Sequence, residues 1–591
     1  MKRTGRVLAI LLALAILLSV SAFAAWNGIG GAWNTHNGTV EAAPTDAAPT
    51  VAKIAMKNSG SGWDGIDNVP VMHTVGTTTY AYVLYDGHAA GARLAKINCN
   101  KAIEKAASSD LYNDAEVVLW DVPVSTKSGF QLSTPLLVEG SDATSEADDT
   151  LYIGLTTTTA LVEADASDSI WTVSGDCTVD GSKLKISSTG TYTMSTSDIT
   201  MLKNNSHRAA TGISIPAGAE MTITAKVNNT VALTKTFDSD DVIDDHFYLN
   251  DVFTSDGEKA VVAGDTNTLS FTFEVTALSG DAYIEYGSLF QTAASVMGFK
   301  DLTSAPAISD ATGIATPTHS VNLNDGGQLN TPITTDGTYI YFGTWQGNKA
   351  YYQWNPSTKK LARTTGNGFY WAGAAVIGSQ VYFGSDNGIL HWRSTSDFAK
   401  TGGTVTLPDS AGNVRSSIMV DGDYFYFTSQ GKYLWCYKAN ASGAPTHQWH
   451  TSLNAVSTST PTKVGNKIYV GYYNGFNKGG VTEVTESRSA SASSYVSKCD
   501  LIDGTEDVNY MPVQSSLVVL PNADSSAAAY VYFSSNSNVG AGYCFEVNGT
   551  TATEVWNTSA AGNGTYALGG MASDGGYMVF GNDYNYLYIV K

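Results

Sequence analysis

One pattern of apolar and polar residues repeats along the chain, most clearly from Asn330 to Thr364. A short apolar run, Thr331 to Thr334, leads into an Asp336-Gly337 turn, and an aromatic, β-branched run of near-alternating polarity, Tyr339 to Gly343, follows it. Such runs between turn residues predict half-buried β-strands. A third run, Ala350 to Trp354, and a weaker fourth one complete a meander. Because this unit leaves apolar faces uncovered, it predicts similar units on either side.

The second run recurs along the chain, usually with a tyrosine that marks it. The markers are Tyr82, Tyr152, Tyr341, Tyr382, Tyr426, Tyr469, Tyr532 and, in place of a tyrosine, Val579. From Tyr341 onward the steps between markers are 41, 44, 43, 63 and 47 residues. A period in the forties with four strands per unit is typical of β-propellers. The fold class predicted is therefore all-β, an eight-bladed propeller, with seven blades as the alternative.

The two ends of the repeat region complement each other. The chain stops after a run that resembles a third strand, Tyr586 to Val590, so the last blade lacks its fourth strand. An isolated strand-like run, Ala52 to Lys57, precedes the first blade. We expect this run to supply the missing strand, which would close the ring and remove an open sheet edge.

A gap of 189 residues separates the markers Tyr152 and Tyr341, where one period would be about 45 residues. The excess predicts a β-sandwich inserted between the second and third strands of blade 2, which would stand on the face where those turns lie. The expected division is a signal peptide (1–24), the first propeller part (25–164), the insert (165–293) and the remaining propeller (294–591). The expected strands of the insert are Lys183 to Ser187, Thr191 to Met194, Met221 to Val227, Ala232 to Phe237, Leu269 to Val275 and Ala282 to Leu289.

The beginning of the chain reads as a targeting segment. Lys2, Arg3 and Arg6 precede an apolar run, Val7 to Val20, and a small-residue cleavage site follows it. The mature chain is expected to begin at Ala25 and to be secreted, extracellular or at the cell surface. No later stretch is long and apolar enough to cross a bilayer.

Charge and cysteine content exclude several classes of function. A net charge of -21 with no basic stripe argues against nucleic acid and against an anionic membrane surface. The five cysteines form no CxxC or CxxCH motif, which excludes covalently attached c-type haem and the usual zinc knuckles.

Several motifs resemble those of a known family. AWNTHNG (32–38), AAPT (47–50), GSGW (60–63) and the repeated STP...DGxxYFG...G units resemble secreted PQQ-like (quinoprotein-like) β-propeller repeat proteins, over residues 25–160 and 295–591. The insert carries SIWTVSG (169–175), ISIPAGAEMTITAKV (213–227) and AYIEYGSLF (282–290), and is similar to jelly-roll modules of the carbohydrate-binding kind.

Enzymes of that family bind a quinone cofactor, PQQ, through AxDxxTGxxxW repeats and a calcium site. Here Lys96 to Asn100, Lys438 to Asn440 and Asp500 to Gly504 keep only parts of that pattern, so no cofactor is expected. Calcium is a further option at Asp238 to Asp245, which offers hard oxygen ligands, although solvated acidic loops are favoured there and at Asp142 to Asp149.

Histidines give little support for a metal centre. His447 and His450 lie an odd number of residues apart on an expected strand, which predicts that they point to opposite faces.

Exposed aromatic side chains are the better candidates for a binding site. We expect a group of them on the insert-bearing face, where aromatic rings stack on sugars or on a partner protein; the alternative is packing between blades or under the sandwich. The group is Trp345, Phe369, Tyr370, Trp371, Tyr472, Tyr473 and Phe476.

The function expected from these features is secreted, non-catalytic binding of a glycan, a cell surface or an extracellular protein partner. Two alternatives stay open. One is a self-assembling subunit of a surface layer or filament, which the acidic composition, rich in Thr, Ser and Tyr, favours. The other is an enzyme, either a PQQ-type oxidoreductase or a carbohydrate-active propeller, which predicts inward-pointing acidic or basic side chains in the channel.

Overall fold

The computed structural model describes residues 38–591 except 61–63, 143, 202–205, 229, 239–242, 250–265, 324–325, 348, 477, 490, 504–510 and 523–527. The signal peptide expected over 1–24 lies outside this range. In the described part the chain is all-β, with one short helix, α2 (Cys99–Glu104), and two 3-10 turns, η1 (His88–Ala90) and η2 (Ser559–Ala561). None of the described helices is long and apolar enough to span a membrane.

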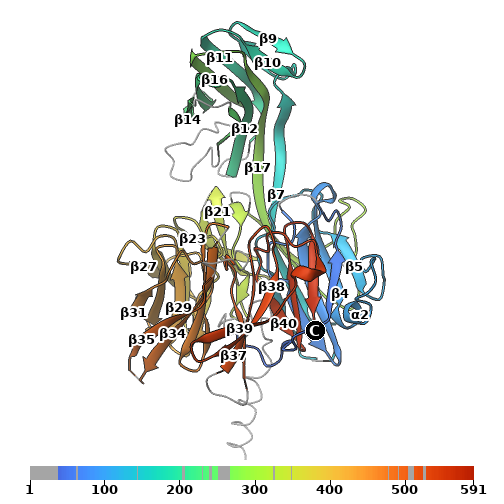
Figure 1. Ribbon diagram of the computed structural model, residues 1–591, viewed down its shortest axis with the longest axis vertical. Helices are drawn as coiled ribbons and strands as arrows, with labels where there is room; N and C mark the ends of the chain where they lie inside the picture. The colour runs from blue at the N-terminus through green and yellow to red at the C-terminus, as the bar shows by residue number, and fades with distance from the viewer. Residues whose placement is uncertain are drawn as a thin grey trace, which may run out of the picture.

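The larger body of the molecule consists of four-stranded antiparallel sheets that follow one another along the chain (Figure 1). Sheet 1 contains β2 (Val71–Val75), β3 (Thr78–Asp86), β4 (Ala92–Asn98) and β5 (Val118–Pro123). Sheet 2 contains β6 (Leu136–Val138), β7 (Thr150–Asp165), β17 (Ala282–Lys300) and β18 (His319–Leu323). Sheet 3 contains β20 (Thr334–Thr335), β21 (Ile340–Gly347), β22 (Ala350–Asn355) and β23 (Lys360–Thr365), with β19 (Gly326–Leu329) beside β21.

The next four sheets repeat this order. Sheet 4 contains β24 (Ala375–Ile377), β25 (Gln380–Ser385), β26 (Ile389–Ser394) and β27 (Gly402–Thr406). Sheet 5 contains β28 (Met419–Asp421), β29 (Tyr424–Ser429), β30 (Tyr433–Lys438) and β31 (Thr446–Ser452). Sheet 6 contains β32 (Thr462–Val464), β33 (Lys467–Asn474), β34 (Lys478–Arg488) and β35 (Ser493–Asp503). Sheet 7 contains β36 (Val518–Pro521), β37 (Ala528–Ser534), β38 (Gly542–Asn548) and β39 (Thr551–Asn557).

Sheet 8 joins the two ends of the described chain. It contains β40 (Ala572–Asp574), β41 (Tyr577–Gly581), β42 (Tyr586–Val590) and, from far away in the sequence, β1 (Val51–Ala55). The pairing is antiparallel, from Val51 opposite Val590 to Ala55 opposite Tyr586. The strand expected over 52–57 thus runs over 51–55 and covers the free edge of β42.

The sheets surround a common axis. The segment that leads into the first strand of each sheet lines one axial cavity, which has a volume of about 50 Å³. The lining residues are Asp67, Asn68, Val69, Leu132, Thr134, Pro332, Trp371, Ser417, Thr458, Thr460, Gln514, Ser515, Ser516, Leu568, Gly569 and Gly570. Consecutive meanders whose leading segments meet around one cavity form a propeller-like arrangement.

The second strand of each sheet is buried on both faces. All residues of β25, β29 and β41 are buried. The half-buried strand predicted for Tyr339 to Gly343 is therefore wrong in its exposure, since β21 is buried from Ile340 to Thr344. The reason is that a neighbouring sheet covers each face of the strand. Alternation of polar and apolar residues along it therefore does not indicate which residues are exposed to solvent.

A ladder of side chains crosses three of the sheets at the marker tyrosine. Tyr82, Tyr426 and Tyr532 each lie opposite a residue of the third strand that itself lies opposite a tryptophan of the fourth. The tyrosine and tryptophan ring centroids are 5.9 to 6.1 Å apart in all three sheets. In each sheet a β-bulge in the fourth strand lies directly before the tryptophan in sequence. The middle residues are Lys96, Cys436 and Cys544, and burial raises the pKa of each of the two thiols to about 12.

Each of these buried tyrosines directs its hydroxyl to an acceptor. Tyr532 and Trp556 both donate to the carbonyl of Pro44, at 3.1 and 3.0 Å. Tyr82 donates to Glu146, which also forms an ion pair with Lys96. An aromatic ring can therefore be buried between sheets without leaving its polar end unpaired.

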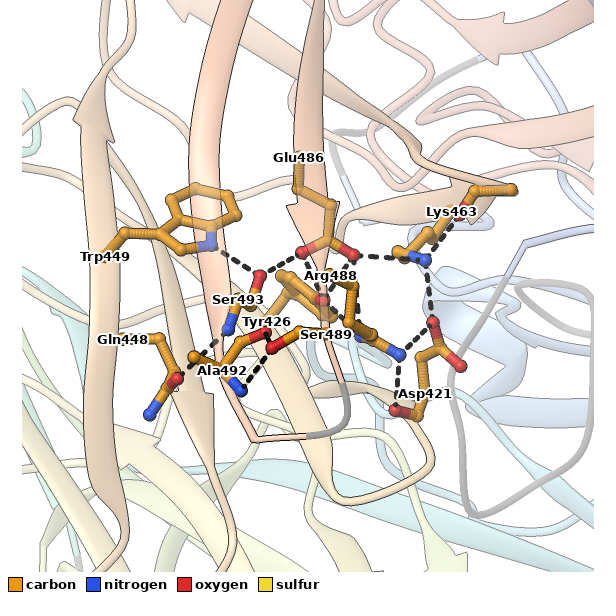
Figure 2. A network of polar contacts seen from close by, with 11 residues as sticks. Asp421, Tyr426, Gln448, Trp449, Lys463, Glu486, Arg488, Ser489, Ala492 and Ser493 are labelled. Carbon is orange, nitrogen blue, oxygen red and sulfur yellow. Dashed lines mark hydrogen bonds and ion pairs between the residues drawn. The ribbon is translucent and has the colours of Figure 1, made fainter.

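Between sheets 5 and 6, Tyr426 belongs to a larger polar network (Figure 2). Its hydroxyl donates to both carboxylate oxygens of Glu486, which is only 1% exposed and also accepts from Ser493 at 2.5 Å. Lys463 and Arg488 form ion pairs with Glu486 at 3.2 and 3.5 Å, and both also contact Asp421. Trp449 donates to Ser493 at 2.8 Å, which ties the ladder of sheet 5 to the β34–β35 hairpin.

The glycine two residues after the marker tyrosine lets the next sheet approach closely. A Cβ on Gly384 would lie 2.2 Å from Val414 Cγ1, and one on Gly471 would lie 2.5 Å from Val513 Cγ1. Each valine belongs to the segment that leads into the following sheet. The glycine is thus required by packing between sheets.

A smaller upper body rises from sheet 2 on the long strands β7 and β17 (Figure 1). These strands pair from Lys300 opposite Thr150 to Tyr286 opposite Asp165, with one bulge at Leu161. β17 therefore passes through the boundary expected at 293/294 without a break. The upper part of β17 belongs to a sheet with β15 (Ile243–Leu249), β12 (Ser206–Ile215), β10 (Lys183–Ile186) and β9 (Cys177–Asp180).

A second sheet packs against this one. It contains β14 (Thr230–Asp238), β13 (Glu220–Val227), β16 (Asn267–Ala277), β11 (Gly190–Ile199) and β8 (Thr172–Ser174). Inward residues such as Ile223 and Phe273 meet Ile213 and Ile284 of the first sheet in one apolar core. β13 alternates between more buried and more accessible residues along its length, as the period of two requires.

The acidic stretch Asp142 to Asp149 is only partly the solvated loop that the sequence favoured, since Asp142 is exposed but two of its carboxyls are not. Asp149 and Glu146 are buried against sheet 1. His73 of β2 lies 3.2 Å from Asp149 and 3.3 Å from Glu139. Burial lowers the pKa of His73, but the hydrogen bonds to Asp149 and Glu139 outweigh it and raise the pKa to about 9. The stretch therefore links sheets 1 and 2 through charge.

We expect the contribution of His73 to stability to depend on pH. Because its pKa is higher in the folded chain (about 9) than its ordinary value of 6.5, this contribution is complete below pH 6.5 and disappears as the pH rises through 9. The difference in free energy of unfolding between wild type and His73→Gln should shrink between pH 6.5 and 9 in denaturant titrations. Asp149→Asn should remove most of the same pH dependence; a pH-independent difference would contradict the assignment.

Loss of Glu486 should destabilise the chain strongly. Glu486→Ala leaves Tyr426, Ser493 and part of the charge of Lys463 and Arg488 uncompensated in a buried site, so we expect a loss of about 3 kcal/mol in the free energy of unfolding. The matched control is Glu104→Ala, which breaks a pair with Lys101 in which the Glu104 side chain is 61% exposed. The control should cost less than about 1 kcal/mol. If the two substitutions lower the free energy of unfolding in urea by the same amount, the buried network stabilises the chain no more than an exposed ion pair does.

Candidate functional site

A cleft lies where the upper body meets the larger one. It has a volume of about 760 Å³. Its upper wall comes from β7, β12 and β17, and its floor from loops and strand ends of the larger body. The lining residues are Asp64, His88, Ser128, Phe130, Leu132, Thr158, Arg208, Phe290, Thr292, Gln328, Trp345, Gln346 and Tyr370. Leu132 also lines the axial cavity, so the two spaces are adjacent.

Two of the aromatic residues expected at the site, Trp345 and Tyr370, lie together in this cleft. Their ring centroids are 5.0 Å apart in an edge-on arrangement. The guanidinium of Arg415 lies 4.8 Å from the Tyr370 ring and 5.5 Å from the Trp345 ring. Asp386 accepts two hydrogen bonds of 2.8 Å from Arg415 and one of 3.2 Å from the Trp345 indole. The aromatic pair is therefore held in place before any ligand arrives.

The remaining expected residues lie elsewhere. Phe369 is fully buried against Tyr351 and Phe383, so it packs between sheets. Tyr472 is buried as well, and its hydroxyl donates to the carbonyl of Ile502.

Trp371 faces the axial cavity rather than the cleft. Tyr473 is half-buried and its hydroxyl accepts from Gln430 at 3.3 Å. Phe476 is 55% exposed and touches the ring of Tyr566. Trp371 nevertheless contacts Tyr370, with ring centroids 4.6 Å apart. The structure thus brings Trp345, Tyr370 and Trp371 together and buries Phe369 and Tyr472 elsewhere.

An acidic cluster beside the cleft was not singled out from the sequence. Burial raises the pKa of Asp64 to about 6 although Arg208 lowers it, and burial also raises the pKa of Asp86 to about 7 and that of Asp583 to about 6. Burial and the charge of Asp583 hold the pKa of Asp67 well above its usual range. Asp64, Asp86 and Asp583 therefore change charge near neutral pH.

The repeat itself contains the signal that would have found part of this cluster. Counting four residues on from each marker gives Asp86, Thr156, Trp345, Asp386, Gln430, Tyr473, Asn536 and Asp583. Members from neighbouring sheets touch: Trp345 donates to Asp386, and Gln430 donates to Tyr473. This position ends the second strand on the face that bears the upper body, so its residue type determines the chemistry of the mouth of the axial cavity.

The lining of the axial cavity bears on the expectation of a quinone cofactor. The quinone cofactor of the resembling family is a polycarboxylate anion, whereas the residues lining the axial cavity include Asp67 and no basic side chain, so they do not fit it. Within the described part of the chain no group of three or more His, Cys, Asp or Glu is arranged to hold a metal ion. The calcium option at Asp238 to Asp245 falls largely outside the described residues.

The prediction that His447 and His450 point to opposite faces is wrong. In β31, Cys436 pairs with Trp449 but Tyr437 pairs with His447, so Gln448 forms a bulge. The bulge brings His447 Nε2 within 3.2 Å of His450 Nδ1, while His450 Nε2 lies 3.0 Å from Asp409. An extra residue in a strand reverses the alternation of faces beyond it.

Comparison with known proteins gives no family for the chain. No protein-family model matches it, and no curated protein matches it. Among solved structures, the chain is similar to the crystal structure of BamB from Moraxella catarrhalis, at 10% identity over 51% of this chain and 79% of that chain, with a TM-score of 0.34. It is also similar to a chain in the crystal structure of a mitotic checkpoint complex, at 12% identity over 51% of this chain and 83% of that chain, with a TM-score of 0.33.

Proposed function

We propose that this chain is a secreted, non-catalytic binding protein: an eight-bladed β-propeller with an inserted jelly-roll domain, which binds glycan on an extracellular partner. Secretion rests on the sequence of the first residues. The eight blades correspond to sheets 1 to 8, and the jelly roll to the two packed sheets of the upper body. The observation that carries the proposal is the cleft between them, with its fixed aromatic pair.

The chemistry of the cleft suits a sugar. Sugars present apolar C–H faces that stack on aromatic rings, and hydroxyls that need both donors and acceptors. Trp345, Tyr370, Phe130 and Phe290 supply rings, whereas Gln328, Ser128, Thr158 and Arg208 are examples of polar side chains among them. Because Asp386 and Arg415 already orient Trp345 and Tyr370, little side-chain entropy would be lost on binding.

We expect loss of either cleft ring to weaken glycan binding. A glycan array with the full mature chain would identify a ligand, and calorimetry would then compare variants. Trp345→Ala and Tyr370→Ala should each weaken binding by roughly tenfold, which corresponds to about 1.4 kcal/mol. Phe476→Ala is the matched control, because this exposed ring does not line the cleft, and it should bind as wild type does. Retention of affinity in both cleft variants, or its loss in the control, would contradict the proposal.

A carbohydrate-active enzyme is the second candidate, and one observation favours it. The carboxyls Asp64, Asp67, Asp86 and Asp583 have raised pKa values beside an aromatic cleft, and a carboxyl that stays protonated near neutral pH suits general-acid catalysis. Measurement of reducing ends released from the array-selected glycan separates the two candidates. Release that Asp64→Asn abolishes would replace the binding proposal.

A further inference from the structure

The bulge in β31 places two histidine rings edge to edge on the last strand of sheet 5. His447 Nε2 lies 3.2 Å from His450 Nδ1. The ring centroids are 5.2 Å apart and the ring planes differ by 42°, so the rings meet through their nitrogens rather than through their faces. Without Gln448 as the extra residue, the two side chains would point to opposite faces of the strand.

The neighbouring sheet holds this bulge in place. Gln448 Oε1 accepts from the amide of Ser493 at 3.2 Å, and the Trp449 indole donates to the hydroxyl of Ser493 at 2.8 Å. Figure 2 shows Gln448 and Trp449 both directed at Ser493, which begins β35. The spacing of His447 and His450 is thus fixed by contacts of the two residues between them. Bulges are over-represented beside functional sites, where they redirect a side chain.

Aromatic rings of β30 support both imidazoles. The His450 ring stacks on Trp435 with centroids 4.6 Å apart, and it lies edge-on to Tyr433 at 5.5 Å. His447 lies edge-on to Tyr437 at 5.1 Å. Trp435 is fully buried, whereas His447 is exposed and the His450 side chain is 26% exposed. The protein therefore positions the two facing nitrogens and leaves them within reach of solvent.

Asp409 determines which nitrogen of His450 carries the proton. Its carboxylate lies 3.0 Å from His450 Nε2 and accepts the ring proton there. In the neutral ring, Nδ1 is then a lone pair directed at His447. A carboxylate in this place is typical of histidines that bind a metal ion through their other nitrogen.

The separation of the facing nitrogens matches that of two ligands on one metal ion. Bonds from zinc to histidine nitrogen are about 2.0–2.1 Å long, so at a tetrahedral angle two such nitrogens are about 3.3–3.4 Å apart. The observed 3.2 Å requires only a small adjustment of the rings. Two histidines form an open chelate, in which water supplies the other ligands.

We propose that His447 and His450 chelate a divalent transition-metal ion such as Zn²⁺, with Asp409 as a positioning residue for His450. Imidazole nitrogen suits such ions, whereas Mg²⁺ and Ca²⁺ prefer oxygen ligands. The ion takes the place of the hydrogen bond between the two rings. Neutral His447 then carries its single proton on Nδ1, so no proton is lost from the pair. Neither histidine lines the cleft, so the site does not depend on glycan binding there.

The test is calorimetric titration of the full mature chain with zinc chloride at neutral pH. We expect saturable binding to a single site, no competition from magnesium chloride, and a higher Tm in the presence of Zn²⁺. His447→Ala and His450→Ala should each weaken Zn²⁺ binding at least tenfold and abolish the rise in Tm, because one imidazole cannot chelate. His319→Ala is the matched control, since this histidine stacks on Tyr152 instead, and it should bind Zn²⁺ as wild type does.

Three results would overturn the proposal: absence of saturable binding, unchanged Zn²⁺ affinity in His447→Ala, or displacement of Zn²⁺ by magnesium chloride at equal concentration. If His450→Ala does not fold because its ring supports Trp435, the exposed His447 variant decides alone. Asp409→Asn should weaken binding less than loss of either histidine, and unchanged affinity there would overturn the positioning role. The glycan titration uses a different ligand and different variants, so either proposal can fail without the other.

Discussion

The architecture depends on burying a tyrosine in the second strand of a sheet while giving its hydroxyl an acceptor. A ring between two sheets contributes a large apolar surface, but an unpaired phenol there would cost much of that gain. The chain meets this condition differently in each sheet, with Glu146, with Glu486 or with the carbonyl of Pro44. Because these acceptors come from other segments, each pairing also fixes the position of a neighbour. The hydrogen bond that allows each tyrosine to be buried therefore also fixes the position of the segment that supplies the acceptor.

The same repeat that builds the body also distributes chemistry around its axis. Packing constrains the marker and the glycine near it, whereas the residue four positions after the marker lies at the end of the strand and varies from sheet to sheet. Trp345, Asp386 and Asp583 occupy this position in three sheets. One face of the molecule thus gains an aromatic wall on one side and carboxyls on another without any change to the sheets beneath.

Sequence periodicity was sufficient for the all-β class, because turns and β-branched or aromatic runs recur at a nearly constant spacing. Periodicity could not predict which strand residues are exposed to solvent, because the pattern of polar residues along β25 or β29 does not show that neighbouring sheets cover both faces. It also failed where one residue alters the register: the bulge at Gln448 moves His447 to the face of His450. The acidic cluster combines Asp64 and Asp67 with Asp583, from opposite ends of the chain, which the pairing of β1 with β42 brings together.

The long antiparallel pairing of β7 with β17 has a mechanical consequence. A domain carried on two flexible linkers can swivel, but one carried on a hydrogen-bonded two-stranded ribbon can only bend or twist with it. Pulling on the upper body along the ribbon would load its hydrogen bonds in shear, so that many must break together before the strands slide. The cleft lies at the base of this ribbon. A force on the upper body would therefore be transmitted into sheet 2 rather than absorbed by a hinge.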